Sequence, residues 1–182
     1  NRVGQLIAAP AAAAVLTQRT PKLDLKTCIE NGYLVIVNLA KGSIGNNVAS
    51  LFGSLLISQL RNAVMSRADQ PTDIYPPVSL LIDEFHSFAT LSIAQLLAES
   101  RKYNLQLTLA HQYAAQLKPE VQAAILGNVG TLISFRVGSD DAKVLIGDFD
   151  PYSPNMLTDQ SPTYARMKRD LQPCEIRTVP FE

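Results

Sequence analysis

Two adjacent carboxylates, Asp83 and Glu84, directly follow the apolar run Val78–Ile82. A short continuous apolar run predicts a buried strand, so both acids are expected at the strand's carboxyl end. In a phosphoryl-transfer site, the first acid holds Mg²⁺, usually through water, and the second orients or deprotonates the attacking water. An acid pair at a strand end also caps helices or forms surface ion pairs, and the pair alone does not separate these interpretations.

A second apolar run, residues 105–110, ends in His111-Gln112. Ligands of open α/β sheets bind at the carboxyl ends of the strands, so Gln112 and His111 are candidates for the same edge as the acids. A turn-capping glutamine and a loop histidine are the alternatives.

Two cations, Arg101 and Lys102, precede that strand at the predicted end of a helix. Cations there complement the helix dipole. The functional alternative is an arginine finger offered to the nucleotide of a neighbouring subunit.

Short apolar runs alternate with helical patterns over most of the chain. Strands are predicted at residues 33–38, 78–83, 105–110 and 131–135. Helices are predicted from Asn46 or Asn47, over residues 92–103, from Pro119 to about Leu126, and from Asp140 or Asp141 to Phe149. This order predicts βαβ crossovers and a mostly parallel sheet. Residues 151–182 hold several prolines and little periodicity, which predicts an irregular tail in which Arg166, Lys168 and Arg169 are solvated.

The composition is that of a globular protein, with 47% hydrophobic and 18% charged residues. Lys plus Arg and Asp plus Glu both number 16, so no net charge steers the chain to nucleic acid. Cys28 and Cys174 stand in unrelated contexts, which favours a reducing cytoplasm over a disulfide framework. No run reaches the roughly 20 apolar residues that span a bilayer, and a zinc site at His86 and His111 is disfavoured.

An ordered set of motifs resembles the TraG/TraD-type conjugative coupling proteins and, more broadly, the HerA/FtsK class of DNA-translocating ATPases. The motifs are Asn38-Leu-Ala-Lys-Gly-Ser-Ile-Gly45, Ile82-Asp-Glu-Phe-His-Ser-Phe-Ala-Thr90, Glu99-Ser-Arg-Lys-Tyr103, Thr108-Leu-Ala-His-Gln112, Gly127-Asn-Val-Gly-Thr131 and Ser134-Phe-Arg-Val-Gly138. The resemblance covers about residues 1–150 and implies a RecA-like P-loop NTPase three-layer sandwich.

The resemblance also implies a hexameric ring that uses ATP and Mg²⁺ to move DNA. By position, Asp83 is the Walker B metal acid, Glu84 the catalytic base and Gln112 the sensor of the γ-phosphate. Arg101 is the finger that acts on a neighbouring subunit, and Lys102 is a weaker candidate for that role. Secretion or relaxosome proteins are the implied partners, in the cytoplasm or at the inner face of the membrane.

One departure from the family pattern bears on activity. A phosphate cradle needs Gly-x-x-x-x-Gly-Lys-[Ser/Thr], and no Gly-Lys dipeptide occurs in the 182 residues. We therefore expect a fragment, with residues 1–150 as the second half of an ATPase core, that is inactive alone. Two alternatives remain. One is a non-catalytic DNA-binding or docking module. The other is a DExH-type helicase fragment, which is disfavoured because such helicases usually have Ser/Thr-Ala-Thr where this chain has Ala110-His-Gln112.

Overall fold

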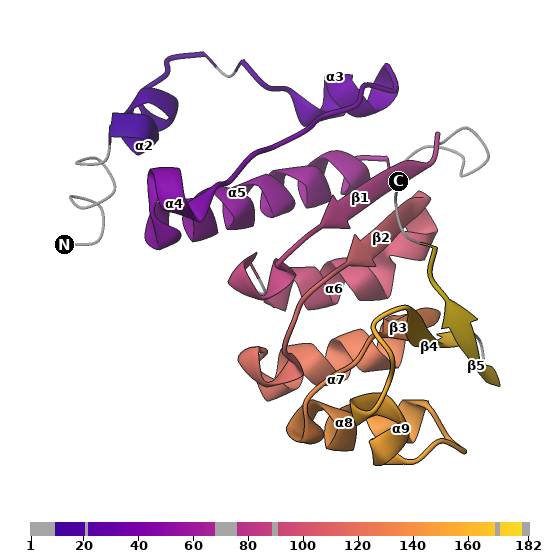
Figure 1. The fold of residues 1–182 in the computed structure, drawn as a ribbon. Helices are drawn as coiled ribbons and strands as arrows, with labels where there is room; N and C mark the ends of the chain where they lie inside the picture. Colours follow the sequence, from indigo (N-terminus) through magenta and orange to yellow (C-terminus); the bar gives the residue numbers. More distant parts are fainter. Residues whose placement is uncertain (1–9, 21, 68–75, 89–90, 170–171, 180–182) are drawn as a thin grey trace. The chain divides into compact units, whose positions relative to one another are not determined.

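The computed structural model describes residues 10–20, 22–67, 76–88, 91–169 and 172–179. The chain divides into two compact units, residues 1–110 and residues 111–182 (Figure 1). The polar, proline-bearing stretch from Arg67 to Pro77 is predicted to be an exposed loop, and its residues 68–75 lie outside the described residues.

The N-terminal unit is built on two parallel strands, β1 (Val78–Ile82) and β2 (Leu105–Leu109). Their register pairs Val78 with Leu105 at one end and Ile82 with Leu109 at the other. Figure 1 shows the two arrows side by side, pointing the same way. This confirms both predicted strands and their parallel pairing, and it brings their carboxyl ends to one edge.

The other elements of this unit are helical. They are α2 (Pro10–Leu16), α3 (Leu25–Glu30), α4 (Lys41–Ile44), α5 (Asn46–Met65), η2 (Phe85–Phe88), α6 (Leu91–Glu99) and η3 (Ser100–Tyr103). Helix α3 begins at the cap Asp24, whose carboxylate accepts hydrogen bonds from the Thr27 hydroxyl and the Lys26 N–H. The Thr27 hydrogen bond lowers the pKa of Asp24, as expected for a carboxylate that caps a helix.

Helices cover one face of the strand pair. Because side chains alternate along a strand, alternate residues of β1 and β2 share that face and pack in one core. Its buried members are Ile57, Val64, Phe88, Ile93, Leu96 and Leu105, and Val78, Leu80, Ile82, Leu107 and Leu109 pack against them. On the opposite face Leu81 is 72% exposed. The described part of the chain therefore shows a sheet covered on one face, not the complete three-layer sandwich that was predicted.

The long helix predicted from Asn46 or Asn47 is confirmed as α5. Its apolar spacing predicts one buried stripe, of which Val48 and Val64 are buried; the predicted members are Val48, Leu51, Phe52, Leu55, Leu56, Leu60, Ala63 and Val64. The helix follows Gly45, whose φ is 82°, without an asparagine cap. Its buried residues are Val48, Ala49, Gly53, Ile57 and Val64, whereas Leu55 is 41% exposed. The ring of Phe88 occupies the place where a Cβ on Gly53 would stand. Small residues at positions 49 and 53 thus let η2 approach the helix closely, a requirement that apolar periodicity does not reveal.

Helix α5 has the length and composition of a membrane-crossing helix, which the sequence did not lead us to expect. An 18-residue window within Asn46–Met65 has a mean hydropathy of 1.2. In the structure, Ile57 and Val64 of this helix lie in the core against the strands, and 28% of the apolar window is buried.

The first predicted strand, residues 33–38, has no ladder partner in the structure. Residues 33–40 run as irregular backbone between α3 and α4. Leu34 is 87% exposed and Ile36 is 82% exposed. A strand requires a partner for its backbone hydrogen bonds, and among the described strands β1 pairs with β2 alone.

The C-terminal unit contains an antiparallel sheet of β3 (Thr131–Ser134), β4 (Tyr164–Arg169) and β5 (Gln172–Arg177), in that order. Its helices are η4 (Ala114–Gln116), α7 (Pro119–Asn128), α8 (Ser139–Leu145), η5 (Ile146–Asp148) and α9 (Pro154–Thr158). The predicted helices after Pro119 and near Asp140 and the strand at residue 131 are confirmed. The prediction of a mostly parallel sheet is wrong for the described strands, since β3 joins an antiparallel sheet.

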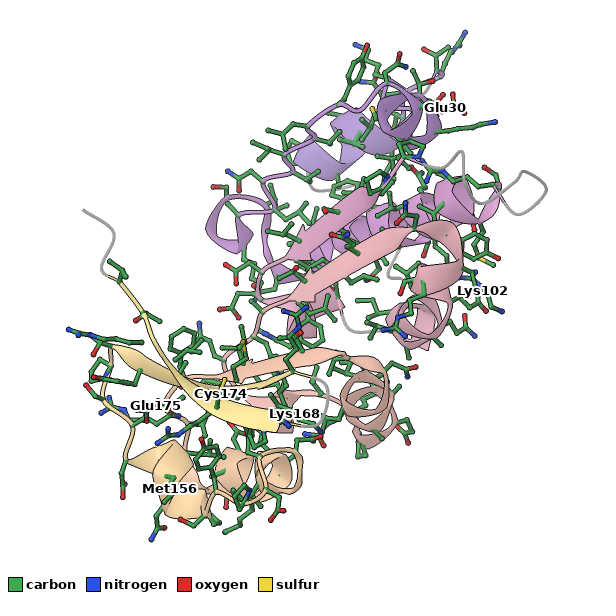
Figure 2. All side chains as sticks on the ribbon, turned by 90° about the vertical axis from the view of Figure 1, so that its right-hand side faces the viewer. Glu30, Lys102, Met156, Lys168, Cys174 and Glu175 are labelled. Carbon is green, nitrogen blue, oxygen red and sulfur yellow. The ribbon has the colours of Figure 1, made fainter. Side chains whose placement is uncertain are left out.

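Residues 151–182 are not the irregular tail that was predicted, because their described part holds α9 and the β4–β5 hairpin. Two of the three cations predicted to be solvated, Arg166 and Lys168, are paired, whereas Arg169 is exposed. Arg166 forms an ion pair with Glu175, and Lys168 Nζ lies 2.6 Å from Asp148 Oδ1. Figure 2 labels Lys168, Cys174 and Glu175 on this hairpin. Charged side chains that pair across strands mask the apolar alternation on which strand prediction depends.

Candidate catalytic site

Asp83 and Glu84 form the turn that directly follows β1. The backbone N–H of Glu84 donates to Asp83 Oδ1 over 2.9 Å, which orients the first carboxylate. The chain leaving β2 runs beside this turn, because the Ala110 N–H donates to the Ile82 carbonyl and Phe85 N–H donates to the Ala110 carbonyl. The acid pair therefore stands at the carboxyl edge of the two parallel strands, as predicted.

The backbone of Glu84 is left-handed, with φ of 49°. In this region the Cβ of an L-residue crowds its own backbone, at a cost of roughly 1–2 kcal/mol. Such residues persist where the surrounding structure enforces them, and they cluster at functional sites. Asn104 is the other described non-glycine residue with positive φ, at 54°, and it ends η3, where asparagine is common.

A series of polar contacts leads from Glu84 through two nearby residues to Lys41, which is distant in the sequence. His86 Nδ1 lies 3.2 Å from Glu84 Oε2, and His86 Nε2 lies 3.2 Å from Ser87 Oγ. Lys41 Nζ donates to Ser87 Oγ over 2.6 Å. The Nδ1 contact is close but falls outside hydrogen-bond alignment, so we describe it as an electrostatic contact.

Sequence reasoning did not find this cluster. The sequence presents His86 as part of a family motif, in the helicase alternative and as a metal ligand, and Lys41 as part of the motif at residues 38–45, but it gives neither residue a role beside Glu84. Lys41 and Ser87 are separated by 46 residues, and only the packing of α4 and α5 against η2 brings them together. Among the described residues no group of three His, Cys, Asp or Glu side chains is arranged to bind a metal.

Asp83 nevertheless has the chemistry to hold Mg²⁺ in the presence of a nucleotide. Its side chain is exposed, and the ion pairs between described residues do not include Asp83. Magnesium in phosphoryl-transfer sites takes one or two carboxylates and completes its shell with water and phosphate oxygens. One oriented carboxylate at the strand edge fits that requirement.

The other predicted site residues are Arg101, Lys102 and Gln112. Arg101 and Lys102 are exposed in η3, ahead of β2, and Figure 2 labels Lys102 beside the start of that strand. They therefore stand at the opposite end of the strands from Asp83 and Glu84. Gln112 is exposed in the C-terminal unit, three residues beyond the end of β2, and its role as sensor stays a prediction.

A cavity of about 1000 Å³ lies between β1 and the segment at residues 33–40. Its walls are mostly apolar and include Leu34, Ile36, Leu56 and Leu80. Lys41, Asp83 and Glu84 also line it, so the acid pair borders an open space beside the unpaired edge of β1.

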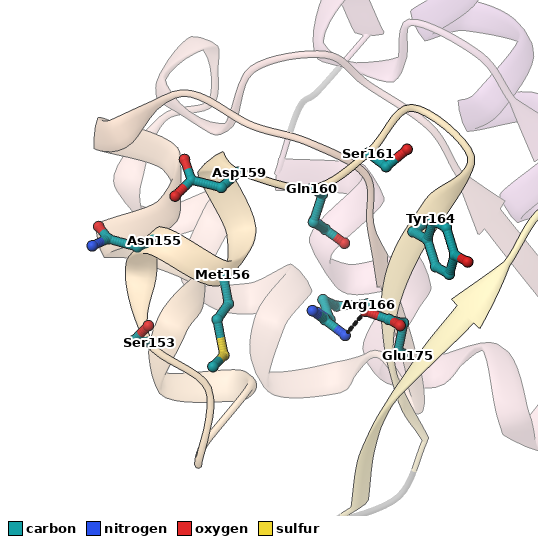
Figure 3. Close-up of a pocket in the computed structure, with 9 residues that line it drawn as sticks. All are labelled: Ser153, Asn155, Met156, Asp159, Gln160, Ser161, Tyr164, Arg166 and Glu175. Carbon is teal, nitrogen blue, oxygen red and sulfur yellow. Dashed lines mark ion pairs between the residues drawn. The ribbon is translucent and has the colours of Figure 1, made fainter.

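The C-terminal unit has a second, more polar cavity of about 520 Å³ (Figure 3). The paired Arg166 and Glu175 form one wall, and the Arg166 guanidinium lies 4.7 Å from the centre of the Tyr152 ring. Gln160 is buried at 6% exposure and donates from Nε2 to the Ser134 and Leu157 carbonyls, each over 3.4 Å. Nothing in the sequence pattern pointed to this cavity.

Residues 77–147 match the family model described as the TraM recognition site of TraD and TraG. The match spans less than half of the chain and contains Asp83, Glu84, Arg101 and Gln112. It confirms, over these residues, the resemblance to TraG/TraD-type coupling proteins that the sequence motifs indicated. No curated protein matches the chain as a relative.

Solved structures show that the chain is similar in fold to a conjugative coupling protein and to a genome packaging NTPase. The bacterial conjugative coupling protein TrwBdeltaN70 superposes with a TM-score of 0.70 at 13% identity, over 95% of this chain and 47% of that one. The genome packaging NTPase B204 from Sulfolobus turreted icosahedral virus 2, in complex with ATP-gammaS, gives a TM-score of 0.61 at 14% identity. That match covers 88% of this chain and 74% of B204.

VirB4 of Thermoanaerobacter pseudethanolicus is also similar, with a TM-score of 0.56 at 19% identity over 75% of this chain and 38% of VirB4. These identities establish likeness of fold. The chain spans about half the length of the TrwB structure that it matches.

Proposed function

We propose that this chain forms the part of a conjugation-type coupling ATPase that carries the metal-binding acid and the general base. The observation that carries the proposal is the Asp83-Glu84 turn at the carboxyl edge of β1 and β2, with Glu84 in a left-handed backbone. The family match includes this turn. The TrwB structure with ADP and Mg²⁺ and the B204 structure with ATP-gammaS support nucleotide chemistry for this fold.

In this proposal Asp83 holds Mg²⁺ through water and Glu84 takes the proton of the attacking water. A magnesium ion held there would neutralise negative charge on the phosphates. From the strand edge, the Glu84 carboxylate would reach the water that attacks the γ-phosphate. Gln112, which follows β2 in the sequence, would sense that phosphate. Proton transfer by such a base contributes about 10²- to 10⁴-fold to turnover.

The phosphate-binding loop would come from residues outside these 182, because they hold no Gly-Lys dipeptide. Residues 1–150 would then be the second half of the ATPase core, and the hairpin-bearing residues 151–182 an addition to it. The full-length protein would assemble as a ring, expected to be hexameric, that moves DNA in the cytoplasm or at the inner face of the membrane. Arg101 would reach the nucleotide of the neighbouring subunit.

The test is steady-state ATP hydrolysis by the full-length protein, with and without DNA, beside Glu84→Gln. Glu84→Gln keeps the shape of the side chain and removes the base, so we expect turnover to fall by at least ~100-fold with ATP binding retained. Glu30→Gln is the matched control, since Glu30 pairs on the surface with Lys26 Nζ at 3.9 Å. Full DNA-stimulated turnover in Glu84→Gln would exclude Glu84 as the base.

A non-catalytic docking module is the second candidate function. It is favoured by the family model, whose description names a recognition site for TraM rather than a catalytic activity. Docking would be supported by a folded full-length protein that binds a TraM-like partner and hydrolyses no ATP under any condition. The acid pair would then be a turn-forming feature.

A further inference from the structure

Four side chains connect the acid pair to the start of α4. Lys41 Nζ donates to Ser87 Oγ over 2.6 Å, Ser87 Oγ lies 3.2 Å from His86 Nε2, and His86 Nδ1 lies 3.2 Å from Glu84 Oε2. The chain of contacts is partly shielded from water, since the side chains of His86 and Glu84 are 20% and 34% exposed. Its first member comes from α4, and the others come from η2 and the turn after β1.

The direction of the hydrogen bonds follows from the chemistry of the lysine. An ammonium group only donates, so Lys41 uses an acceptor lone pair of Ser87 Oγ and leaves the hydroxyl proton for another partner. His86 Nε2 is the acceptor within reach of that hydroxyl. A neutral ring that accepts at Nε2 carries its proton on Nδ1, and Nδ1 is the nitrogen that faces the Glu84 carboxylate.

Ser87 is fixed by further bonds and gives the chain of contacts a rigid centre. The Ser50 hydroxyl of α5 donates to the Ser87 carbonyl over 2.8 Å, and the Ser87 N–H donates to the Glu84 carbonyl over 3.0 Å. On either side of Ser87, Phe85 and Phe88 are buried at 1% and 8% exposure. Because η2 is anchored in the core, His86 has a defined position relative to Glu84.

We propose that Lys41, Ser87 and His86 are positioning residues that set the orientation of the Glu84 carboxylate. The inference rests on the proposed function, in which Glu84 is the base. Holding Oε2 beside His86 Nδ1 restricts rotation of the carboxylate, so the direction of its second oxygen is set as well. A base whose orientation is fixed by a third group is the arrangement found in nucleophile–base–orienter sites, and a small misplacement of the base slows the reaction strongly.

The first experiment replaces His86 in the full-length protein and measures kcat and KM for ATP. Asparagine places its amide N–H near the position of Nδ1, whereas glutamine places it near the position of Nε2. We expect His86→Ala and His86→Gln to lower kcat about 10- to 100-fold with KM for ATP nearly unchanged. His86→Asn should recover most of the lost kcat, because its amide N–H takes the place of the Nδ1 group that lies beside Glu84 Oε2.

The second experiment is a double-mutant cycle between positions 41 and 86. If Lys41 acts only through Ser87 and His86, Lys41→Ala should lower kcat in the wild-type background and change nothing further in His86→Ala. Lys26→Ala is the matched control, because Lys26 is an exposed lysine whose Nζ lies 3.9 Å from Glu30 on α3. It should leave kcat at the wild-type value in both backgrounds.

The outcomes separate the inference from the function on which it rests. Turnover that is lost in Glu84→Gln but unchanged in His86→Ala and Lys41→Ala would overturn the positioning role and leave the base assignment standing. Equal kcat for His86→Asn and His86→Gln would show that the contact between Nδ1 and Glu84 does not position the carboxylate. A wild-type protein without turnover, or full turnover in Glu84→Gln, would overturn the proposed function and the positioning role together.

Discussion

The backbone of Glu84 departs from the conformation that its residue type prefers. Its φ of 49° lies in the left-handed region, and glycine adopts this region without steric cost. A carboxylate is nevertheless present at this position, beside His86 and directly after Asp83. We interpret this as stability given up for the placement of an acid at the strand edge.

This strain predicts a difference between two substitutions that both remove the carboxylate. We expect Glu84→Gly to be more stable than Glu84→Ala by about 1 kcal/mol, because only glycine relaxes the left-handed backbone. Denaturant unfolding of the full-length variants measures the difference. Since both variants lose the contact with His86, that contact cancels in the comparison. An alanine variant as stable as the glycine variant would show that position 84 is not left-handed in solution.

At the scale of elements, the segment at residues 33–37 is apolar, exposed and without a strand partner. Its residues Leu34 and Ile36 face a cavity of about 1000 Å³ whose other wall is β1. The second edge of β1 forms no ladder with any described strand. We infer that in the full-length protein this segment closes the cavity and pairs with β1, which would satisfy the backbone groups of both.

The inference predicts that Ile36→Asp destabilises the full-length protein by about 3 kcal/mol, the cost of burying an unpaired charge. Val179→Asp is the control, because Val179 is 88% exposed, close to the 82% of Ile36, and lies in no predicted strand. It should change stability by less than about 0.5 kcal/mol. The measurement is the change in melting temperature of each variant relative to the wild-type protein. Equally small changes for Ile36→Asp and Val179→Asp would mean that the segment stays exposed.

At the scale of the whole molecule, Arg101 lies too far from its own acid pair to act there. It precedes β2, while Asp83 follows β1, and the five paired residues of each strand separate them. At about 3.3 Å per residue, the strands alone span roughly 15 Å. Arg101 is also exposed, so the nucleotide it serves would belong to a neighbouring subunit.

Mixing two inactive variants tests this arrangement. Arg101→Ala and Glu84→Gln should each lower ATP turnover by two or more orders of magnitude, about 10³-fold for the finger. Mixed subunits bring an intact Glu84 from one variant to an intact Arg101 from the other, so we expect turnover to return in part. By itself, Lys102→Ala should lower ATP turnover much less than Arg101→Ala does. No recovery in mixed assemblies would contradict a role across the subunit interface.

The sequence by itself determined the local elements and the acid pair. Short stretches of sequence predict several elements, because apolar periodicity and helix-end signals act over a few residues. These elements are β1, β2, the helix after Pro119 and the helix from residue 46. Asp83 and Glu84 were identified for the same reason, since their place after an apolar run is a local property. The ordered motifs added the coupling-protein resemblance, which the family model confirms over residues 77–147.

Tertiary structure decided what depends on contacts between distant residues. Lys41 reaches Ser87 across 46 residues, and Arg166 and Lys168 gain acidic partners from β5 and η5. The buried face of α5 includes Gly53, against which the Phe88 ring packs, as well as the apolar residues Val48, Ile57 and Val64. Local pattern cannot contain these facts, because the energy of an ion pair or a close contact depends on the partner that folding brings within reach.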